Sequence, residues 1–129
     1  MARRNVSGNS PWEPIVGYSR AVRAGPHVWI AGTTATDTNG QIVGAGDAGA
    51  QARQALANIR RALAAAGAGM EHVVRTRMYV TRIEDAEAVG AAHAECFREI
   101  RPAATMIEVG RLVSPDMLVE IEAEAFVGD

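Results

Sequence analysis

Two residues of a predicted helix have the types and spacing that could support covalent chemistry. Cys96 follows His93 by three positions, and side chains three apart on a helix lie close enough to touch. A base beside a thiol can activate it as a nucleophile. However, a thiol inside a helix is more often a small core residue, and His93 stands between the apolar residues Val89 and Phe97. We therefore expect both side chains to face the core.

The sequence does not contain the residues that several other kinds of site require. Every basic residue is an arginine, so there is no lysine for a Schiff base or for a phosphate-binding loop. The three histidines show no familiar metal-ligand spacing. One cysteine forms neither an internal disulfide nor a cysteine-based zinc site. The glycine-rich segment 44–50 lacks the GK[ST] ending of a phosphate loop.

The periodicity of apolar residues predicts the elements that must position any site. A period of two predicts strands, and a repeat of three and four residues predicts helices. Strands are expected over 18–24, 27–35, 71–81, 104–109 and 118–127, and helices over 48–66 and 84–98. Asp47 has the position of a helix N-cap, and Gly67 that of a C-terminal cap. The polar residues 1–14 are expected to form a flexible arm before a single domain over 15–129.

This order, β-β-α-β-α-β-β, predicts an α+β fold with two helices on one face of the sheet. The uncovered face would carry charged residues that alternate along two strands: Arg75, Arg77, Glu120, Glu122 and Glu124. Two interpretations stay open. The face is either solvated, with cross-strand ion pairs each worth well under about 1 kcal/mol, or it is a subunit interface.

The bulk composition narrows the possible partners and the location. The chain has 129 residues, 48% of them hydrophobic, and a net charge of −2. This balance disfavours nucleic acid as a partner, since nucleic-acid-binding domains usually carry a basic patch. No apolar run is long enough to span a membrane. The basic N-terminus lacks the apolar segment of a signal peptide, so we expect a cytoplasmic protein.

Nearly the whole chain from about residue 14 resembles one family, the Rid (reactive intermediate deaminase, YjgF-type) proteins. The matching segments occur in the family's order: VGYSRAV (16–22), VWIAGTTA (28–35), QARQALANIRRALAAAGA (51–68), VVRTRMYVTRIEDAEAV (73–89), RPAATMIEVGRL (101–112) and VEIEAEA (119–125). The resemblance rests on this ensemble and on no single motif.

The resemblance implies a chorismate mutase-like fold with a mixed sheet, assembled as a homotrimer with clefts between subunits. The charged sheet face would then be an interface. Typical members hydrolyse enamines and imines such as 2-aminoacrylate to a keto acid and ammonia, without a cofactor or metal. A small molecule in the cleft and the protein itself are thus the implied partners.

The resemblance also implies positions for the site. The family's glycine-tyrosine-serine turn matches residues 17–19, so Tyr18 should line the cleft. The serine-glycine-glutamine of the second strand matches residues 31–33, so Gly32 would offer backbone groups and Thr33 replaces the glutamine. Glu120 matches the family's last-strand glutamate, which positions or activates water. For Glu120 an interface ion pair is the other interpretation.

One position departs from the family in a way that affects its chemistry. The family's proline-alanine-arginine is Pro102-Ala103-Ala104 here. That arginine binds the substrate carboxylate with two parallel hydrogen bonds. Removing a buried charged partner of this kind costs about 2–5 kcal/mol, which is roughly thirty- to several-thousand-fold in affinity.

Other positions around the lost arginine have changed as well. Met106 replaces a cysteine, and His93 stands where the family commonly has an aromatic residue. By this match His93, Ala104 and Met106 are expected to line the substrate-binding cleft, with a more apolar wall than in the family. We therefore expect deaminase-type hydrolysis of a substrate that lacks a carboxylate or that uses another arginine: Arg20, Arg77 or Arg101. Hydrolysis of 2-imino acids should be weak or absent. The alternative is a non-catalytic protein that binds small molecules or partners on the same trimer.

Overall fold

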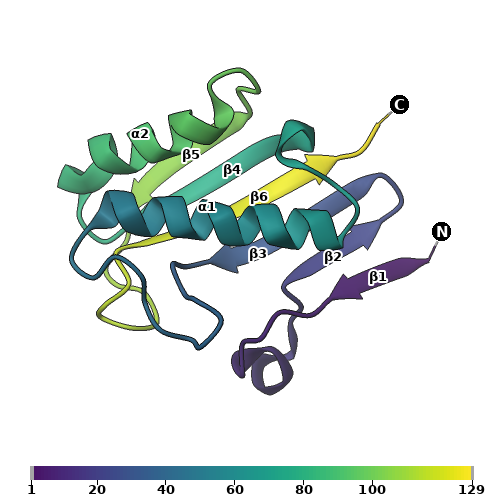
Figure 1. The fold of residues 1–129 in the computed structure, drawn as a ribbon, viewed down its shortest axis with the longest axis horizontal. Coiled ribbons are helices and arrows are strands. Elements are labelled where there is room, and N and C mark those ends of the chain that lie inside the picture. The colour runs from purple at the N-terminus through teal and green to yellow at the C-terminus, as the bar shows by residue number, and fades with distance from the viewer. Residues whose placement is uncertain (1, 129) are drawn as a thin grey trace.

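The computed structural model describes residues 2–128, and within them six strands form one sheet that two α-helices cover (Figure 1). The strands are β1 (Arg3–Val6), β2 (Ala21–Ala24), β3 (His27–Thr33), β4 (Val73–Val80), β5 (Ala103–Glu108) and β6 (Val119–Phe126). The α-helices are α1 (Ala48–Ala65) and α2 (Ala86–Phe97). Short helical turns occupy Glu13–Gly17, Met70–His72 and Ile83–Asp85.

The strand order in the sheet is β1-β2-β3-β6-β4-β5. Neighbouring strands are antiparallel except β4 and β5, which are parallel and are joined by the crossover helix α2. Both α-helices lie on the same face of the sheet (Figure 1). The predicted α+β fold, with two helices on one face of a mixed sheet, is confirmed.

Helix α1 has the ends that its sequence predicts. The carboxylate of Asp47 accepts a hydrogen bond from the backbone N–H of Ala50 at 3.0 Å, an N-cap worth about 1 kcal/mol. At the other end Gly67 adopts φ 78°, the left-handed conformation that glycine reaches without a steric penalty.

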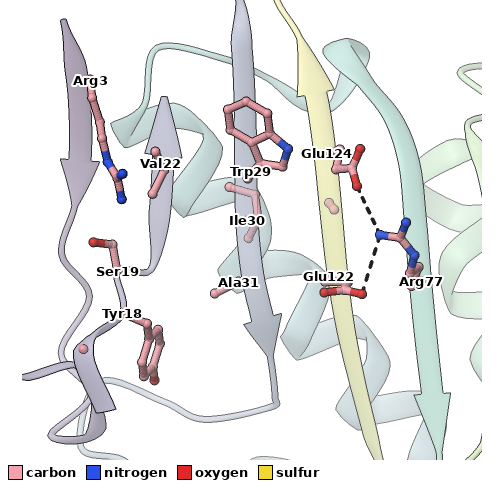
Figure 2. Close-up of a pocket in the computed structure, with 12 residues that line it drawn as sticks. Arg3, Tyr18, Ser19, Val22, Trp29, Ile30, Ala31, Arg77, Glu122 and Glu124 are labelled. Atoms are coloured by element: carbon pink, nitrogen blue, oxygen red, sulfur yellow. Dashed lines mark hydrogen bonds and ion pairs between the residues drawn. The ribbon is translucent and has the colours of Figure 1, made fainter. Parts of the chain in front are cut away.

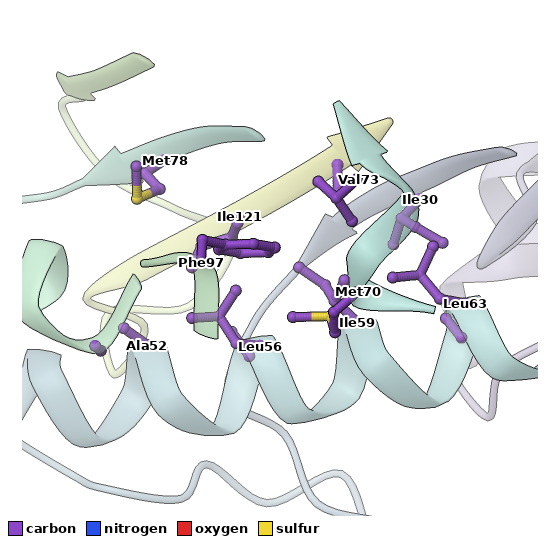
Figure 3. Packing of buried hydrophobic residues seen from close by; sticks show 14 of the residues in the cluster. Ile30, Ala52, Leu56, Ile59, Leu63, Met70, Val73, Met78, Phe97 and Ile121 are labelled. Carbon is purple, nitrogen blue, oxygen red and sulfur yellow. The ribbon is translucent and has the colours of Figure 1, made fainter. Parts of the chain in front are cut away.

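The core lies between the helices and the sheet. Leu56, Ile59 and Leu63 point from α1 toward the strands, where Ile121 of β6 is among the buried residues that meet them (Figure 3). Phe97 of α2 is also buried there. Burial of apolar area contributes about 25 cal/mol per Å². The apolar residues between the helices and the sheet therefore stabilise the packing of both helices on it.

Strand β4 departs from strict alternation at its start. The pattern predicted that Val74 faces the core with Thr76, Met78 and Val80. Instead Val73 is buried and Val74 is 51% exposed. The pairing of β4 with β6 shifts between Val73 and Arg75. Such an irregularity reverses the alternation on one side of it, so Val73 and Val74 each point to the face opposite to the one predicted.

The prediction of a flexible arm over residues 1–14 is wrong for much of that segment. Arg3–Val6 forms β1, which pairs antiparallel with β2. Glu13 is buried, and its carboxylate accepts two contacts from the backbone N–H of Gly8, at 3.0 and 3.1 Å. The polar composition concealed this strand because β1 is exposed along most of its length and its stability comes from backbone pairing.

Gln51, a fully buried polar residue of α1, fixes the start of β6. Its side-chain nitrogen donates to the carbonyl of Asp116 at 3.0 Å, and its side-chain oxygen accepts from the N–H of Leu118 at 2.9 Å. A buried amide with satisfied hydrogen bonds holds a unique geometry. Glu120 follows two residues later, so this contact helps to position it.

Candidate functional site: an acidic residue over a strand glycine

Glu120 projects from β6 onto the sheet face that the helices leave open. It pairs in register with Tyr79 of β4, while its neighbours Val119 and Ile121 are buried in the core. Burial raises the pKa of the half-buried Glu120 carboxyl above its ordinary value; Arg20 opposes this rise, and the like charge of Glu122 adds to it. A carboxyl with a raised pKa exchanges protons more readily near neutral pH than an exposed one.

Gly32 of β3 lies directly beneath that carboxyl. A Cβ atom at this position would be 2.1 Å from Oε2 of Glu120, so a larger residue would displace the acid. The register of β3 against β6 shifts between Ile30 and Thr33. This irregularity surrounds Gly32 and brings it under Glu120.

Arg20, at the approach to β2, completes the group. One of its terminal nitrogens, Nη2, donates to the carbonyl oxygen of Gly32 at 2.6 Å. Its Cζ lies 5.8 Å from the centre of the Tyr18 ring, within the range of a cation–π contact. Residues from three segments thus meet at Gly32: Arg20 on its carbonyl, Glu120 over its α-carbon and Tyr18 beside the guanidinium.

A shallow hollow of about 380 Å³ lies on the same face. Figure 2 shows Tyr18, Ser19 and Ala31 on one side of it and Arg77 with two glutamates on the other. Glu120 and Gly32 are not among its lining residues. In one chain, therefore, the hollow adjoins the Glu120 group and does not enclose it.

Arg77 is occupied by ion pairs with neighbours on the sheet. Its Nη1 lies 3.1 Å from Glu124 and 3.7 Å from Glu122 (Figure 2). The hydroxyl of Tyr79 donates to Glu122 at 2.5 Å, and this hydrogen bond, with burial, raises the pKa of Tyr79. In the single chain the charge of Arg77 is thus compensated by its neighbours on the sheet.

The remaining predicted site residues lie elsewhere in the chain. Ala104 and Met106 pair in register with Thr76 and Met78 of β4, which are buried under the helices. Paired residues of neighbouring strands point to the same face. The side chains of Ala104 and Met106 therefore point to the helical side of the edge strand β5, opposite to Glu120.

His93 also lies on the helical side. Its Nε2 is 2.9 Å from the hydroxyl of Thr76, and its ring centre is 4.6 Å from that of Phe97. Burial lowers the pKa of His93, which favours a neutral ring at neutral pH. Within one chain it does not meet Glu120. The expectation that His93 faces the core agrees with this position.

Thr33 and Arg101 both lie outside the Glu120 group. The side chain of Thr33 is buried, and its hydroxyl donates to the carbonyl of Ala31 at 2.7 Å. The structure therefore does not bring this predicted binding residue to the open face. Arg101 is exposed in the turn after α2, with its N–H donating to Phe97 at 2.8 Å. Of the three arginines considered, only Arg20 approaches Glu120.

Comparison with known proteins identifies the family of this chain. The sequence profile of the family described as Endoribonuclease L-PSP matches residues 8–127. The chain belongs to this family, the Rid or YjgF family. The chain is 36% identical over 114 residues to the 3-aminoacrylate deaminase RutC of Acinetobacter baylyi, covering 88% of this chain and 90% of the relative.

Solved structures agree with this assignment. Rv2704 of Mycobacterium tuberculosis, a member of the YjgF/YER057c/UK114 family, has a TM-score of 0.89 and 49% identity, with 98% of this chain and 100% of that chain covered. The Rid-family protein YyfA of Yersinia pestis has a TM-score of 0.86 and 30% identity, with the same coverage. The chorismate mutase-like Rid fold is thereby confirmed.

Two further observations concern the described part of this Rid chain. Among residues 2–128 no group of three or more histidine, cysteine, aspartate or glutamate side chains is arranged to hold a metal ion. Within the same range no helix combines the length and apolarity needed to cross a membrane.

Proposed function

We propose that this Rid protein is a hydrolase of the imine or enamine deaminase type. The observation that carries the proposal is the half-buried Glu120, whose carboxyl has a raised pKa and lies over Gly32 beside Arg20. A carboxyl in such a setting can accept a proton and return it. The 36% identical relative named as a 3-aminoacrylate deaminase supports the same reaction class.

In the proposed reaction Glu120 transfers a proton between water and nitrogen. The substrate carries a protonated C=N group. The Glu120 carboxylate accepts a proton from water while the water oxygen forms a bond to the C=N carbon. The π electrons of the C=N bond move to nitrogen. The carboxyl then gives the proton to that nitrogen. The C–N bond breaks as the hydroxyl gives its proton to the Glu120 carboxylate, and the products are a carbonyl compound and ammonia. Glu120 then releases to solvent the proton that the C=N group had carried. One water is consumed, and no electrons are transferred.

The complete cleft is proposed to form between subunits of a homotrimer. In a single chain Ala104, Met106 and His93 lie on the helical side, whereas Tyr18 and Glu120 lie on the open face. The two groups can line one cleft if the edge strand of one subunit packs against the open face of the next. The exposed apolar residues of the open face support such contact, since patches of this kind mark interaction surfaces: Trp29, Val74 and Phe126.

The substrate is proposed to differ from that of family members that have the arginine. Ala104 offers neither charge nor reach for a carboxylate bound at the β5 edge. Hydrolysis of 2-imino acids should therefore be slow for this protein. RNA cleavage has little support, because the chain has a net charge of −2 and only 5% aromatic residues, whereas RNA binding relies on basic and aromatic side chains.

The proposal is tested with imines made in the assay. An amino-acid oxidase supplies imines that bear a carboxylate, and an amine oxidase supplies imines without one. Wild-type protein should accelerate ammonia release from at least one of them, and Glu120→Gln should return the rate to background. Glu84→Gln, at a side chain 69% exposed, makes the same chemical change on the surface and should retain the activity.

A background rate for wild-type protein across the whole set would contradict hydrolysis and leave the binding-protein alternative. The same conclusion would follow if Glu120→Gln were as active as wild type. The thermal stability of both variants should be measured and shown to match that of wild type, so that loss of folded protein is not counted as loss of catalytic activity.

A further inference from the structure

The imidazole of His93 has one ring nitrogen that is hydrogen-bonded and one that is free. Nε2 lies 2.9 Å from the hydroxyl of Thr76. Nδ1 has no hydrogen-bond partner within residues 2–128, and in that range the only buried side-chain nitrogen or oxygen without a partner is Nε of Arg20. Nδ1 of His93 therefore reaches solvent, although the residue is partly buried, and a ligand can contact it.

The hydroxyl of Thr76 decides which nitrogen of His93 carries the proton. Thr76 is fully buried, and within residues 2–128 its hydroxyl contacts only Nε2 of His93. A buried hydroxyl needs an acceptor for its hydrogen, so it donates to Nε2, and in a neutral ring the proton then lies on Nδ1. Burial lowers the pKa of His93, which favours the neutral ring. Nδ1 is thus an uncharged hydrogen-bond donor.

This donor lies beside the position at which the family's arginine is absent. Thr76 and Ala104 are register partners in the parallel pair of β4 and β5, and neighbouring strands are about 4.8 Å apart. Ala104 is exposed, and its methyl group leaves the approach to the imidazole open over this edge of the sheet. The ring of Phe97, 4.6 Å away between ring centres, packs against His93 and helps to fix its direction.

The chemistry of this edge suits a neutral acceptor better than an anion. A carboxylate is matched by the charged fork of an arginine, and Ala104 supplies neither charge nor donor. A carboxylate that lost water here would face only one uncharged N–H, and desolvation of an unpaired charge is unfavourable. The oxygen of an amide or ester carbonyl loses less hydration and accepts one hydrogen bond from Nδ1.

We propose that His93 determines substrate specificity by donating a hydrogen bond from Nδ1 to a neutral carbonyl oxygen of the substrate. The inference rests on the proposed function and names the substrate class: an imine whose carbon bears an amide or ester group in place of a carboxylate. A site built around such a hydrogen bond discriminates against substrates that lack the acceptor. Thr76 is a positioning residue, because it sets the tautomer. In the proposed inter-subunit cleft, His93 would lie on one wall and Glu120 on the other.

Binding is measured by NMR titration of the full chain with pyruvamide and with two probes of similar size, pyruvate and butanone. Pyruvate has a carboxylate in place of the amide, and butanone lacks the second oxygen. Pyruvamide should bind at least about fivefold more tightly than either, the value of one neutral hydrogen bond. Absence of pyruvamide binding at tens of millimolar, or pyruvate binding as tightly as pyruvamide, would overturn the inference.

The tautomer is measured on the wild-type protein by heteronuclear NMR of the imidazole rings at a pH at which they are neutral. His93 should carry its proton on Nδ1. His72 is an internal reference for the opposite tautomer, because its Nδ1 accepts from the backbone N–H of Gly69 at 2.9 Å. Thr76→Val removes the hydroxyl with little change of shape and should lower the population of the Nδ1–H tautomer. A wild-type His93 with its proton on Nε2 would overturn the inference.

Two substitutions assign the donor to one nitrogen of His93. The amide of His93→Gln can reach the place of Nε2 and keep the contact with Thr76, but it offers no donor at Nδ1. This variant should bind pyruvamide at least about fivefold more weakly and lose the preference over butanone. The shorter amide of His93→Asn lies near the place of Nδ1, so this variant should keep more of the preference. The reverse order of the two variants, or wild-type affinity of His93→Gln, would overturn the inference.

Ala91→Gln is the matched control, since it adds the same side chain on the exposed side of α2 and should leave the affinity unchanged. If His93→Gln does not fold, the tautomer and the selectivity of wild type among the three probes still test the inference. Failure of the two proposals is distinguishable. Pyruvamide binding that depends on His93 without turnover of any imine would refute the hydrolase alone. Turnover of the imine of glycinamide that is unchanged in His93→Gln would refute the role of His93 alone.

Discussion

The carboxylate of Glu120 occupies the space that a side chain at position 32 would need. A Cβ at Gly32 would lie 2.1 Å from Oε2 of Glu120, far inside van der Waals contact. Arg20 holds the carbonyl of the same residue at 2.6 Å. One glycine therefore sets the placement of both charged groups, and changes at this position should affect chemistry more than folding.

Gly32→Ala should reduce imine hydrolysis by at least about tenfold, because the new methyl group displaces the proton-transferring carboxyl. Gly69→Ala is a matched control, since its Cβ would lie 2.2 Å from Oε1 of Glu71, and the exposed Glu71 side chain can move aside. Steady-state rates of the two variants provide the measurement. Equal rates for Gly32→Ala and wild type would show that Glu120 tolerates displacement.

Ala104→Arg should raise the hydrolysis of 2-imino acids, because it restores a carboxylate anchor at the β5 edge. The double variant Ala104→Arg, Glu120→Ala should lose that gain, since binding alone does not speed the chemical step. The rates of both variants are compared with wild type in the oxidase-coupled assay. If the single variant binds 2-oxobutanoate but stays at background, the hydrolase proposal is abandoned.

The unfolding free energy should fall with rising pH through the titration of Glu120. Burial raises its folded-state pKa above the ordinary 4.5, so between 4.5 and the raised value the folded chain retains a proton that the unfolded chain has released. This contribution is complete below about pH 4.5 and is lost above the folded pKa. Denaturant titrations should therefore show wild type losing stability relative to Glu120→Gln across that window, and the opposite slope would contradict this account.

Two glycines should respond to alanine with opposite signs. Gly90 lies inside α2 with nothing within 4 Å of its Cβ position, so Gly90→Ala should stabilise the protein by about 0.5–1 kcal/mol. Gly67 has φ 78° at the end of α1, so Gly67→Ala should destabilise it by about 1 kcal/mol. Chemical denaturation of the two variants measures both effects, and a destabilised Gly90→Ala would indicate a contact at that surface.

Sedimentation equilibrium should give a mass of three times 13.6 kDa for the wild-type protein. Trp29→Glu should reduce that mass, because it places a charge on the exposed apolar part of the open face. Val113→Glu alters another exposed apolar residue, 77% exposed in a loop, and should leave the mass unchanged. A wild-type monomer at micromolar concentration would refute the trimer and, with it, the inter-subunit cleft.

Features that depend on local pattern could be predicted from the amino-acid sequence alone. The limits of α1 follow from Asp47 and Gly67, because capping involves residues within one or two turns of the helix end. The alternation in β6 predicted which side chains of that strand enter the core. The loss of a charged group at Ala104 was also evident, since it requires only the identity of one residue.

The tertiary structure decided the relationships between strands. Strand β1 has no apolar alternation and exists through its backbone pairing with β2. Val73 is buried in place of Val74 because of the register between β4 and β6. Arg20, Gly32 and Glu120 come together because β3 stands between β2 and β6 in the sheet. Periodicity encodes the face to which a side chain points, whereas strand order and register, set by contacts distant in sequence, decide which side chains meet.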